Sequence, residues 1–327
     1  MFDNFFNTWR PDNYHGFGKK RKYFEEWYYK LITKNKDFSL AIIPGVTYSK
    51  DGKNSHSFIQ FYNGAKLNST YFKFEVKDFV SEKKDFHVKI KDSIFKKDFI
   101  KLDIKENDNK INGELLFEQI KGWPVKLLSP GIMGWYGLVG FMECYYHVLS
   151  FKHRINGFIN INGETIDFDD GWGYIEKNWG TSFPSSWVWI QSNQFNENEN
   201  SAFMFSVAKI PFLNMKFNGF VGGLLHNNKF YPFATYNGSK IKNISINDNS
   251  VNIEIASTKY LLKINAERKN GFYLPYPTNS GMDGKILESL KSNLTIELSE
   301  KKSGNLIFKG NSDFTGLEIS DRAKNLM

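Results

Sequence analysis

Short runs of alternating apolar and polar residues recur along the whole chain. The clearest examples are residues 72–77, 100–105, 251–255 and 294–298. A period of two is typical of a β-strand that buries one face. Polar, turn-rich segments separate such runs, at residues 49–54, 106–113, 196–201 and 247–250. Many short strands with turns between them predict a β-sandwich or β-barrel.

The chain has one candidate helix, Asp283–Ser292, in which Ile286, Leu287 and Leu290 share a face. Elsewhere the helical period of apolar residues is missing. We therefore predict an all-β fold of antiparallel strands with one short helix.

The aromatic strands form a weak internal repeat. Three candidate strands of the first half resemble three of the second half, about half a chain later: 24–30, 38–43 and 56–64 against 183–193, 202–207 and 217–226. Such an offset is expected of two duplicated barrels. We predict an N-terminal barrel over residues 1–166 and a C-terminal barrel over residues 167–327.

Aromatic residues make up 17% of the chain and hydrophobic residues 41%, which suits a large core and a pocket for an apolar or aromatic ligand. The net charge is +8, but the lysines alternate with acidic or apolar residues. This pattern indicates a solvated surface rather than a nucleic-acid site. Peripheral contact of the basic surface with a membrane stays open, as does the oligomeric state.

The single cysteine, Cys144, excludes an internal disulfide and favours a reducing compartment. Residues 1–16 do not resemble a signal peptide. We expect a cytoplasmic protein, with peripheral membrane association as an option. The apolar stretch 131–151 contains Glu143, whose insertion into a bilayer would cost roughly 2.5–3.5 kcal/mol, so we interpret it as strand and loop.

Carboxylates, histidine and large aromatic residues concentrate in segments 24–30, 142–148 and 171–180, the last followed by 187–193. In strands, Glu25 would share a face with Trp27 and Tyr29, and Glu143 would share one with His147. Burial among aromatic rings raises the pKa of a carboxyl group, which can then act as a general acid. Tryptophan faces could stabilise a carbocation.

These properties suit acid-catalysed addition across an alkene. The candidate proton donors are Glu176 and Glu25, with Glu143 and His147 as partners. The candidate substrate-binding residues are Trp27, Tyr29, Tyr174, Lys177, Asn178, Trp179, Trp187, Trp189, Gln191 and Asn193. The alternative is that pairs such as Glu176–Lys177 or Glu25–Lys30 are structural salt bridges. The histidines are dispersed and no phosphate-binding loop occurs, so neither a metal site nor a cofactor is predicted.

Several of these segments resemble the tocopherol cyclase family. The most specific is Gly173–Gly180, and Trp9, Tyr14–Gly16 and Phe24–Lys30 resemble the opening of the family. The resemblance covers essentially the whole chain, although Glu26 stands where the family usually has glycine. It implies paired lipocalin-like barrels, similar to those of carotenoid 1,2-hydratases. It also implies cofactor-free cyclisation of a prenylated quinol, in which the prenyl double bond is protonated and the phenol oxygen captures the cation.

Three functions remain open at this point. The first is a tocopherol cyclase-type intramolecular lyase, an isomerase, or a hydratase, acting on an apolar or prenylated small molecule. The second is a non-catalytic carrier of lipids or isoprenoids with the same pocket. The third is a carbohydrate-binding protein, which would need tryptophan rings exposed in a shallow groove.

Overall fold

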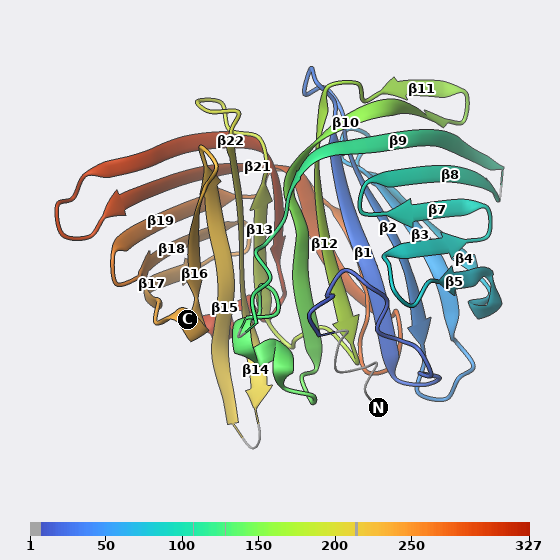
Figure 1. The fold of residues 1–327 in the computed structure, drawn as a ribbon, viewed down its shortest axis with the longest axis horizontal. Helices are drawn as coiled ribbons and strands as arrows, with labels where there is room; N and C mark the ends of the chain where they lie inside the picture. The colour runs from blue at the N-terminus through green and yellow to red at the C-terminus, as the bar shows by residue number, and fades with distance from the viewer. Residues whose placement is uncertain (1–7, 107, 128, 213–214) are drawn as a thin grey trace. The chain divides into compact units, whose positions relative to one another are not determined.

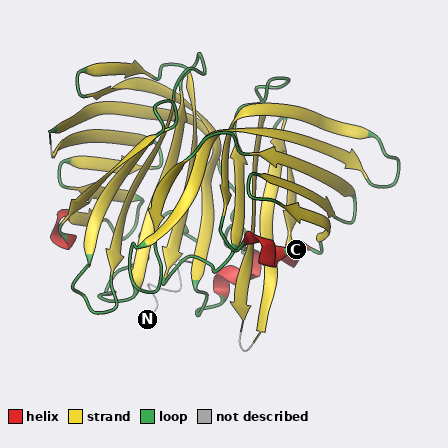
Figure 2. Cartoon of the chain, turned by 180° about the vertical axis from the view of Figure 1, so that it is seen from behind, coloured by secondary structure: helices red, strands yellow, loops and turns green. Residues whose placement is uncertain are grey.

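The computed structural model of the protein describes residues 8–327 except 107, 128, 213 and 214. Two antiparallel β-sheets account for nearly all of its regular structure (Figures 1 and 2). The predicted all-β class of two lipocalin-like domains is therefore confirmed.

The first sheet has twelve strands in the order β4-β3-β2-β1-β12-β10-β9-β8-β7-β6-β5, and β11 pairs with β10 outside this path. Its strands are β1 (Tyr23–Ile32), β2 (Ser39–Tyr48), β3 (His56–Asn63), β4 (Asn68–Phe74), β5 (Phe79–Ser81), β6 (His87–Ile90), β7 (Ser93–Lys96), β8 (Phe99–Glu106), β9 (Asn109–Lys121), β10 (Cys144–Ile161), β11 (Glu164–Asp167) and β12 (Gly171–Gly180).

The second sheet has ten strands in the order β16-β15-β14-β13-β22-β21-β19-β18-β17, and β20 pairs with β21. Its strands are β13 (Trp187–Ser192), β14 (Ser201–Phe212), β15 (Met215–His226), β16 (Lys229–Ala234), β17 (Lys240–Ile246), β18 (Ser250–Ala256), β19 (Tyr260–Glu267), β20 (Phe272–Tyr276), β21 (Gly284–Glu300) and β22 (Leu306–Ile319).

Helical structure in the described residues is limited to short 3₁₀ turns: η1 (Val76–Asp78), η2 (Gly134–Leu138), η3 (Thr235–Asn237) and η4 (Ala323–Leu326). The predicted helix Asp283–Ser292 is wrong, because this segment forms the start of β21. The pairing of β21 with β22 shifts register on either side of Ser292. Such bulges disturb strict alternation and leave apolar residues at a spacing that mimics a helix.

The strand order supports the predicted internal repeat. In the first sheet β1, β2 and β3 are consecutive neighbours, and β12 and β10 follow on the other side of β1. In the second sheet β13, β14 and β15 repeat this arrangement, with β22 and β21 on the other side of β13. The aromatic strands that suggested the repeat therefore occupy equivalent positions in the two sheets.

The chain divides into two compact units, one of residues up to Phe183 with Pro275–Gly284, the other of Pro184–Leu274 with Lys285–Met327. The predicted boundary at residues 166 and 167 differs from this division. Strand β12 lies after that boundary but pairs with β1 on one side and β10 on the other. Removing it would cut the first sheet in two.

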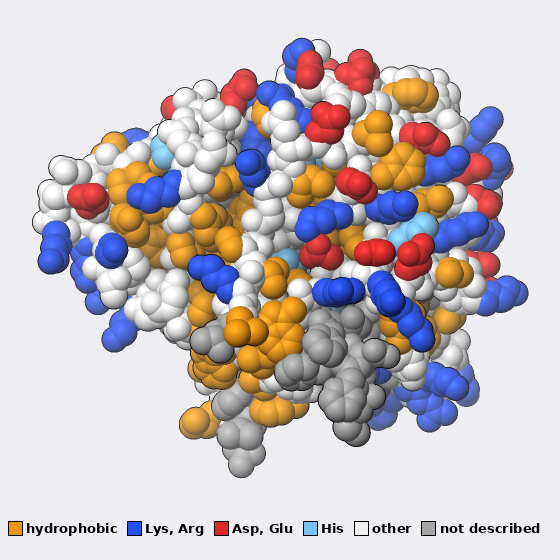
Figure 3. Space-filling model, in the orientation of Figure 1, with side chains coloured by type: hydrophobic (Ala, Val, Ile, Leu, Met, Phe, Trp, Pro, Cys, Tyr) orange, Lys and Arg blue, Asp and Glu red, His pale blue; other side chains and the backbone are white. Residues whose placement is uncertain are grey.

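Each unit encloses its own apolar core. In the first unit, side chains from nearly every strand of the sheet converge, among them Trp27 and Tyr29 of β1, Phe95 of β7 and Ile175 of β12. The sheet therefore curls around one core. Its outer surface over β5–β9 mixes basic and acidic side chains (Figure 3), some of them paired, as are Lys101 and Glu114. This is the solvated surface predicted from the lysine pattern.

Strands β9 and β10 approach each other closely at Gly157. Gly157 has a φ of +119°, and a Cβ there would lie 2.1 Å from the carbonyl oxygen of Glu114. We expect Gly157→Ala to lower the free energy of unfolding by about 1–3 kcal/mol, because it adds both a clash and backbone strain. Gly140 is the control, since a Cβ there meets nothing within 4 Å. Urea unfolding of both variants measures the difference, and equal stabilities would contradict this account.

Candidate active site

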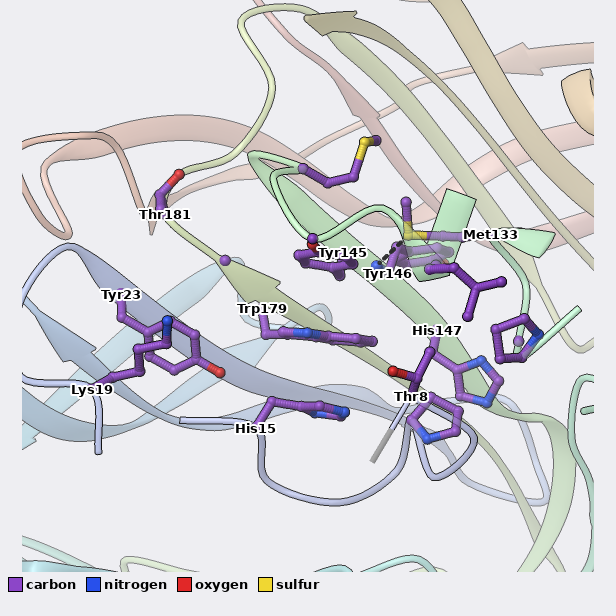
Figure 4. A pocket seen from close by; sticks show the side chains of 18 of the residues that line it. Thr8, His15, Lys19, Tyr23, Met133, Tyr145, Tyr146, His147, Trp179 and Thr181 are labelled. Carbon is purple, nitrogen blue, oxygen red and sulfur yellow. Dashed lines mark hydrogen bonds between the residues drawn. The ribbon is translucent and has the colours of Figure 1, made fainter. Parts of the chain in front are cut away.

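A pocket of about 350 Å³ opens in the first unit (Figure 4). This volume lies in the range of about 300–1,000 Å³ that is usual for small-molecule sites. Its wall is built from the loop before β1, the loop between β9 and β10, and the adjoining ends of β10 and β12. The pairing of β12 with both β1 and β10 brings these segments together.

Three stacked rings form one wall of the pocket. The indole of Trp179 lies between the imidazole of His15, at a centroid distance of 4.5 Å, and the phenol ring of Tyr145, at 5.4 Å. The planes are tilted by 7° and 12°, so the rings are nearly parallel, as Figure 4 shows. The hydroxyl of Tyr145 donates to the carbonyl oxygen of Val139, which ties the stack to the opposite loop.

A buried ion pair lies behind this wall. The Nζ of Lys177 is 2.6 Å from Oε1 of Glu25, and both side chains are fully buried. They belong to neighbouring strands, since β1 pairs with β12 so that Glu25 lies opposite Trp179 and Trp27 opposite Lys177. The Lys177 ammonium also lies 5.0 Å from the ring centre of Trp27 and 4.6 Å from that of Trp179.

Every side of this ion pair is hydrogen-bonded. The backbone N–H of His15 donates to both oxygens of Glu25, at 3.0 and 2.9 Å, and the hydroxyl of Tyr23 donates to Oε2. Lys177 donates to the carbonyl oxygens of Pro11 and Asn13, and its Nζ lies 2.8 Å from Nδ1 of His15. The segment before β1 is thus fixed to the strands by the charges that it covers.

The protonation state of Glu25 differs from the sequence-based prediction of a neutral carboxylic acid. Burial alone would raise the pKa of Glu25, but Lys177 and His15 together lower it below its ordinary value. The prediction of a protonated Glu25 is therefore wrong, because a cation lies beside it. Burial also lowers the pKa of Lys177, against the opposing influence of Glu25. The ammonium of Lys177 is accordingly a better proton donor than an ordinary lysine.

His147 also lines the pocket, on the opposite side of Trp179 from Tyr23 (Figure 4). Its Nδ1 accepts from the backbone N–H of Ile132 at 3.4 Å, and its Nε2 is 3.5 Å from Asp12, which is also paired with Lys97 at 2.6 Å. These partners assign the ring proton to Nε2. Burial lowers the pKa of His147 to about 4, so the ring is neutral at pH 7 and connects the two loops of the pocket.

The second predicted acid, Glu176, belongs to a different cluster on the opposite face of β12. Oε2 of Glu176 accepts from the hydroxyls of Tyr174, at 2.5 Å, and Tyr146. The two hydroxyls are 3.1 Å apart. Glu176 is almost fully buried, and Lys177, its neighbour in sequence, pairs with Glu25 instead.

The remaining predicted residues are distributed over both units. Glu143 accepts at 2.7 Å from the hydroxyl of Ser182 instead of joining His147, because it precedes β10 and lies outside the paired strand. Asn178 is within 4.0 Å of the thiol of Cys144, on the other side of the strand from Trp179. Trp27 and Tyr29 lie in the core of the first unit, and Tyr174 beside Glu176. The residues of β13 and its end belong to the second unit, namely Trp187, Trp189, Gln191 and Asn193.

His15, Asp12 and Tyr23 are not among the predicted site residues, although each contacts one of them. His15 and His147 are far apart in the sequence, and no local pattern of residues connects them. The available signal was the Tyr14–Gly16 segment, which belongs to the family resemblance.

No group of three or more His, Cys, Asp or Glu residues that could hold a metal ion occurs in the described part of the chain. Over the same residues, the structure has no helix with the length and apolar character needed to span a bilayer. The apolar stretch 131–151 forms η2, the loop after it and the first part of β10, as predicted.

The fold and the pocket define a tandem lipocalin-like protein with an aromatic-walled cavity beside a buried charge cluster. Residues 96–321 match the model of the tocopherol cyclase-like family. The chain belongs to this family, and the predicted resemblance is confirmed.

The similarity extends to a curated relative and to solved structures. A probable chloroplastic tocopherol cyclase of Oryza sativa subsp. japonica is 24% identical over 210 residues, 61% of this chain and 44% of that protein. The chain thus spans less than half the length of the relative. CghA in complex with Sch210972 has a TM-score of 0.55 and 9% identity, over 91% of this chain and 88% of CghA. An AttH-type protein of Nitrosomonas europaea has a TM-score of 0.53 and 14% identity, over 90% and 92%. These structures share the fold.

Proposed function

We propose that the protein catalyses the acid-assisted cyclisation or hydration of a prenylated, lipid-like molecule in the pocket of the first unit, without a cofactor. The observation that carries this proposal is the His15–Trp179–Tyr145 stack in front of the buried Glu25–Lys177 pair. In this proposal the cluster supplies the proton and the aromatic rings lie next to it. Membership of the tocopherol cyclase-like family and the name of the curated relative support the same class of reaction.

In this proposal His15 is the proton donor. It lines the pocket, and its Nδ1 is 2.8 Å from the ammonium of Lys177. Lys177 and His15 can share one proton, and the lowered pKa of Lys177 reduces the cost of moving that proton onto the imidazole. Glu25 holds the opposite charge beside both residues, so the cluster keeps one proton in place.

The cyclisation needs no second reactant. The proton adds to one carbon of the prenyl double bond and leaves a tertiary carbocation. The phenol oxygen of the same molecule attacks this cation, and the phenol proton returns to His15. If water attacks instead, the product is the hydrate. The face of Tyr145 that points away from Trp179 stabilises the cation as it forms, since π faces attract positive charge.

The experiment that tests this proposal is incubation of the purified protein with a panel of prenylated hydroquinones and phenols. Chromatography separates the cyclic isomer, and a mass increase of one water identifies a hydrate. We expect one of these products to form from at least one prenylated phenol, and none from the analogue with a saturated side chain. Ligands that are retained but never converted would overturn the proposal in favour of a carrier. Binding only to sugars would favour the carbohydrate-binding alternative.

A further inference from the structure

The charged residues that line the pocket are of one sign. Lys19, Arg21 and Lys22 contribute to the wall, and no aspartate or glutamate is among the described lining residues. The three basic residues lie in the loop that follows the Gly16 turn and leads into β1. The Nζ of Lys19 lies 6.0 Å from the ring centre of Tyr23, which also lines the pocket. Positive charge is therefore concentrated at the solvent-exposed rim of this cavity.

Carboxylates of the protein do little to neutralise this loop. Among the ion pairs of the described residues, none joins Lys19, Arg21 or Lys22 to an acidic side chain within 4.0 Å. The pKa of Asp51 is lowered chiefly by hydrogen bonds from the backbone of Lys53 and the hydroxyl of Ser49, and Arg21 adds only the smallest of the contributions, from a distance. A ligand anion at the mouth could accept charge-assisted hydrogen bonds from these side chains.

The pocket is polarised along its length. In Figure 4, Lys19 and Tyr23 lie on one side of the stacked rings, and Met133 and His147 on the other. Further apolar or small residues line the cavity together with Met133, namely Pro130, Gly131, Gly137, Leu138 and Met142. One end is thus basic and exposed to water, whereas the other lining is mainly apolar or aromatic.

We propose that the substrate is an anionic amphiphile, with a carboxylate or phosphate monoester held by Lys19, Arg21 and Lys22 and a prenyl chain running along the edge of the ring stack towards Met133. This inference rests on the proposed function and names the class of substrate for the same site. The anionic head fixes the direction of entry, and the reacting double bond then comes next to His15.

A matched pair of ligands tests the inference by binding alone. The probes are 3-farnesyl-4-hydroxybenzoate and its uncharged methyl ester, which differ by one negative charge, with farnesyl phosphate as a third probe. Quenching of tryptophan fluorescence gives each affinity. We expect the carboxylate to bind about tenfold more tightly than the ester, because three exposed charge contacts contribute modestly but in the same direction. Added salt should weaken only the charged ligands. Farnesyl phosphate decides between the two head groups.

The control variant is Lys20→Ala, which removes a charge from the same loop at a residue that does not line the pocket. The triple variant K19A/R21A/K22A should abolish the preference for the carboxylate and leave ester binding unchanged, whereas K20A should keep the preference. Equal binding of acid and ester by the native protein would overturn the inference. So would loss of binding to phosphatidylglycerol vesicles in the triple variant with unchanged affinity for the carboxylate, because the loop would then serve a membrane. If the protein converted only neutral substrates, the inference of an anionic substrate would be overturned, whereas the proposed cyclisation or hydration would stand.

Discussion

Lys177→Met is expected to lower the free energy of unfolding by about 3–5 kcal/mol, the usual effect of removing one partner of a buried ion pair. The substitution leaves the fully buried carboxylate of Glu25 without its cation. It also removes the bonds that Lys177 donates to Pro11 and Asn13, so the segment before β1 should loosen. Chemical unfolding followed by tryptophan fluorescence measures the loss.

The double variant Glu25→Gln/Lys177→Met is the matched control. It replaces both charges by neutral groups of similar size, so it should recover part of the stability that the single variant loses. A double variant whose loss of stability equals the sum of the two single losses would contradict the ion-pair account. It would show that the two side chains act independently.

The single variant Lys177→Met should also change the pH dependence of stability. In the native protein the pKa of Glu25 is lowered, so the pair stabilises the fold above pH 4.5, and this contribution is lost as the pH falls below that value. In Lys177→Met the effect of burial prevails, and the pKa of Glu25 should rise. Its contribution would then be largest at low pH and fall as the pH increases. Unfolding curves at several pH values would show whether the direction reverses.

His15→Phe is expected to lower the turnover of a prenylated phenol by about 10²–10⁴-fold, the usual contribution of a general acid. A phenyl ring can keep the stack on Trp179, where the imidazole lies at 4.5 Å, but it carries no proton. Ligand affinity should therefore change much less than kcat. Steady-state kinetics together with fluorescence binding separates these two effects.

His87→Phe is the matched control for this variant. His87 pairs with Glu82 on the outer strands of the first sheet and does not line the pocket. We expect its turnover to equal that of the native protein. If His15→Phe retains full turnover, His15 is not the proton donor, and the Glu176 cluster with Tyr146 and Tyr174 becomes the next candidate.

The sequence predicted the strands well because burial of one face leaves a period of two in the residues. Glu25, Trp27 and Tyr29 were placed on one face of β1, and they lie together inside the first unit. Near Ser292 the same logic failed, since bulges in β21 interrupt the alternation. The extent of the first unit was missed because the pairing of β12 with β1 is a long-range property that local patterns do not record.

Part of the candidate site could also be predicted from the sequence. Glu25, Lys177 and Trp179 were selected from their unusual aromatic surroundings, and they do form one cluster. The partner of Glu25 depends on strand register, so Lys30 was weighed instead of Lys177. The direction of the pKa shift of Glu25 followed from that partner and could not be predicted without it.

The most direct measurement is the reaction carried out in deuterium oxide. If an acid in the pocket protonates the prenyl double bond, each product molecule must carry one deuterium on the carbon next to the newly formed carbon–oxygen bond. Mass spectrometry and NMR should find this label with the native protein, and little product of any kind with His15→Phe. A cyclised or hydrated product formed by the native protein without carbon-bound deuterium would contradict the mechanism.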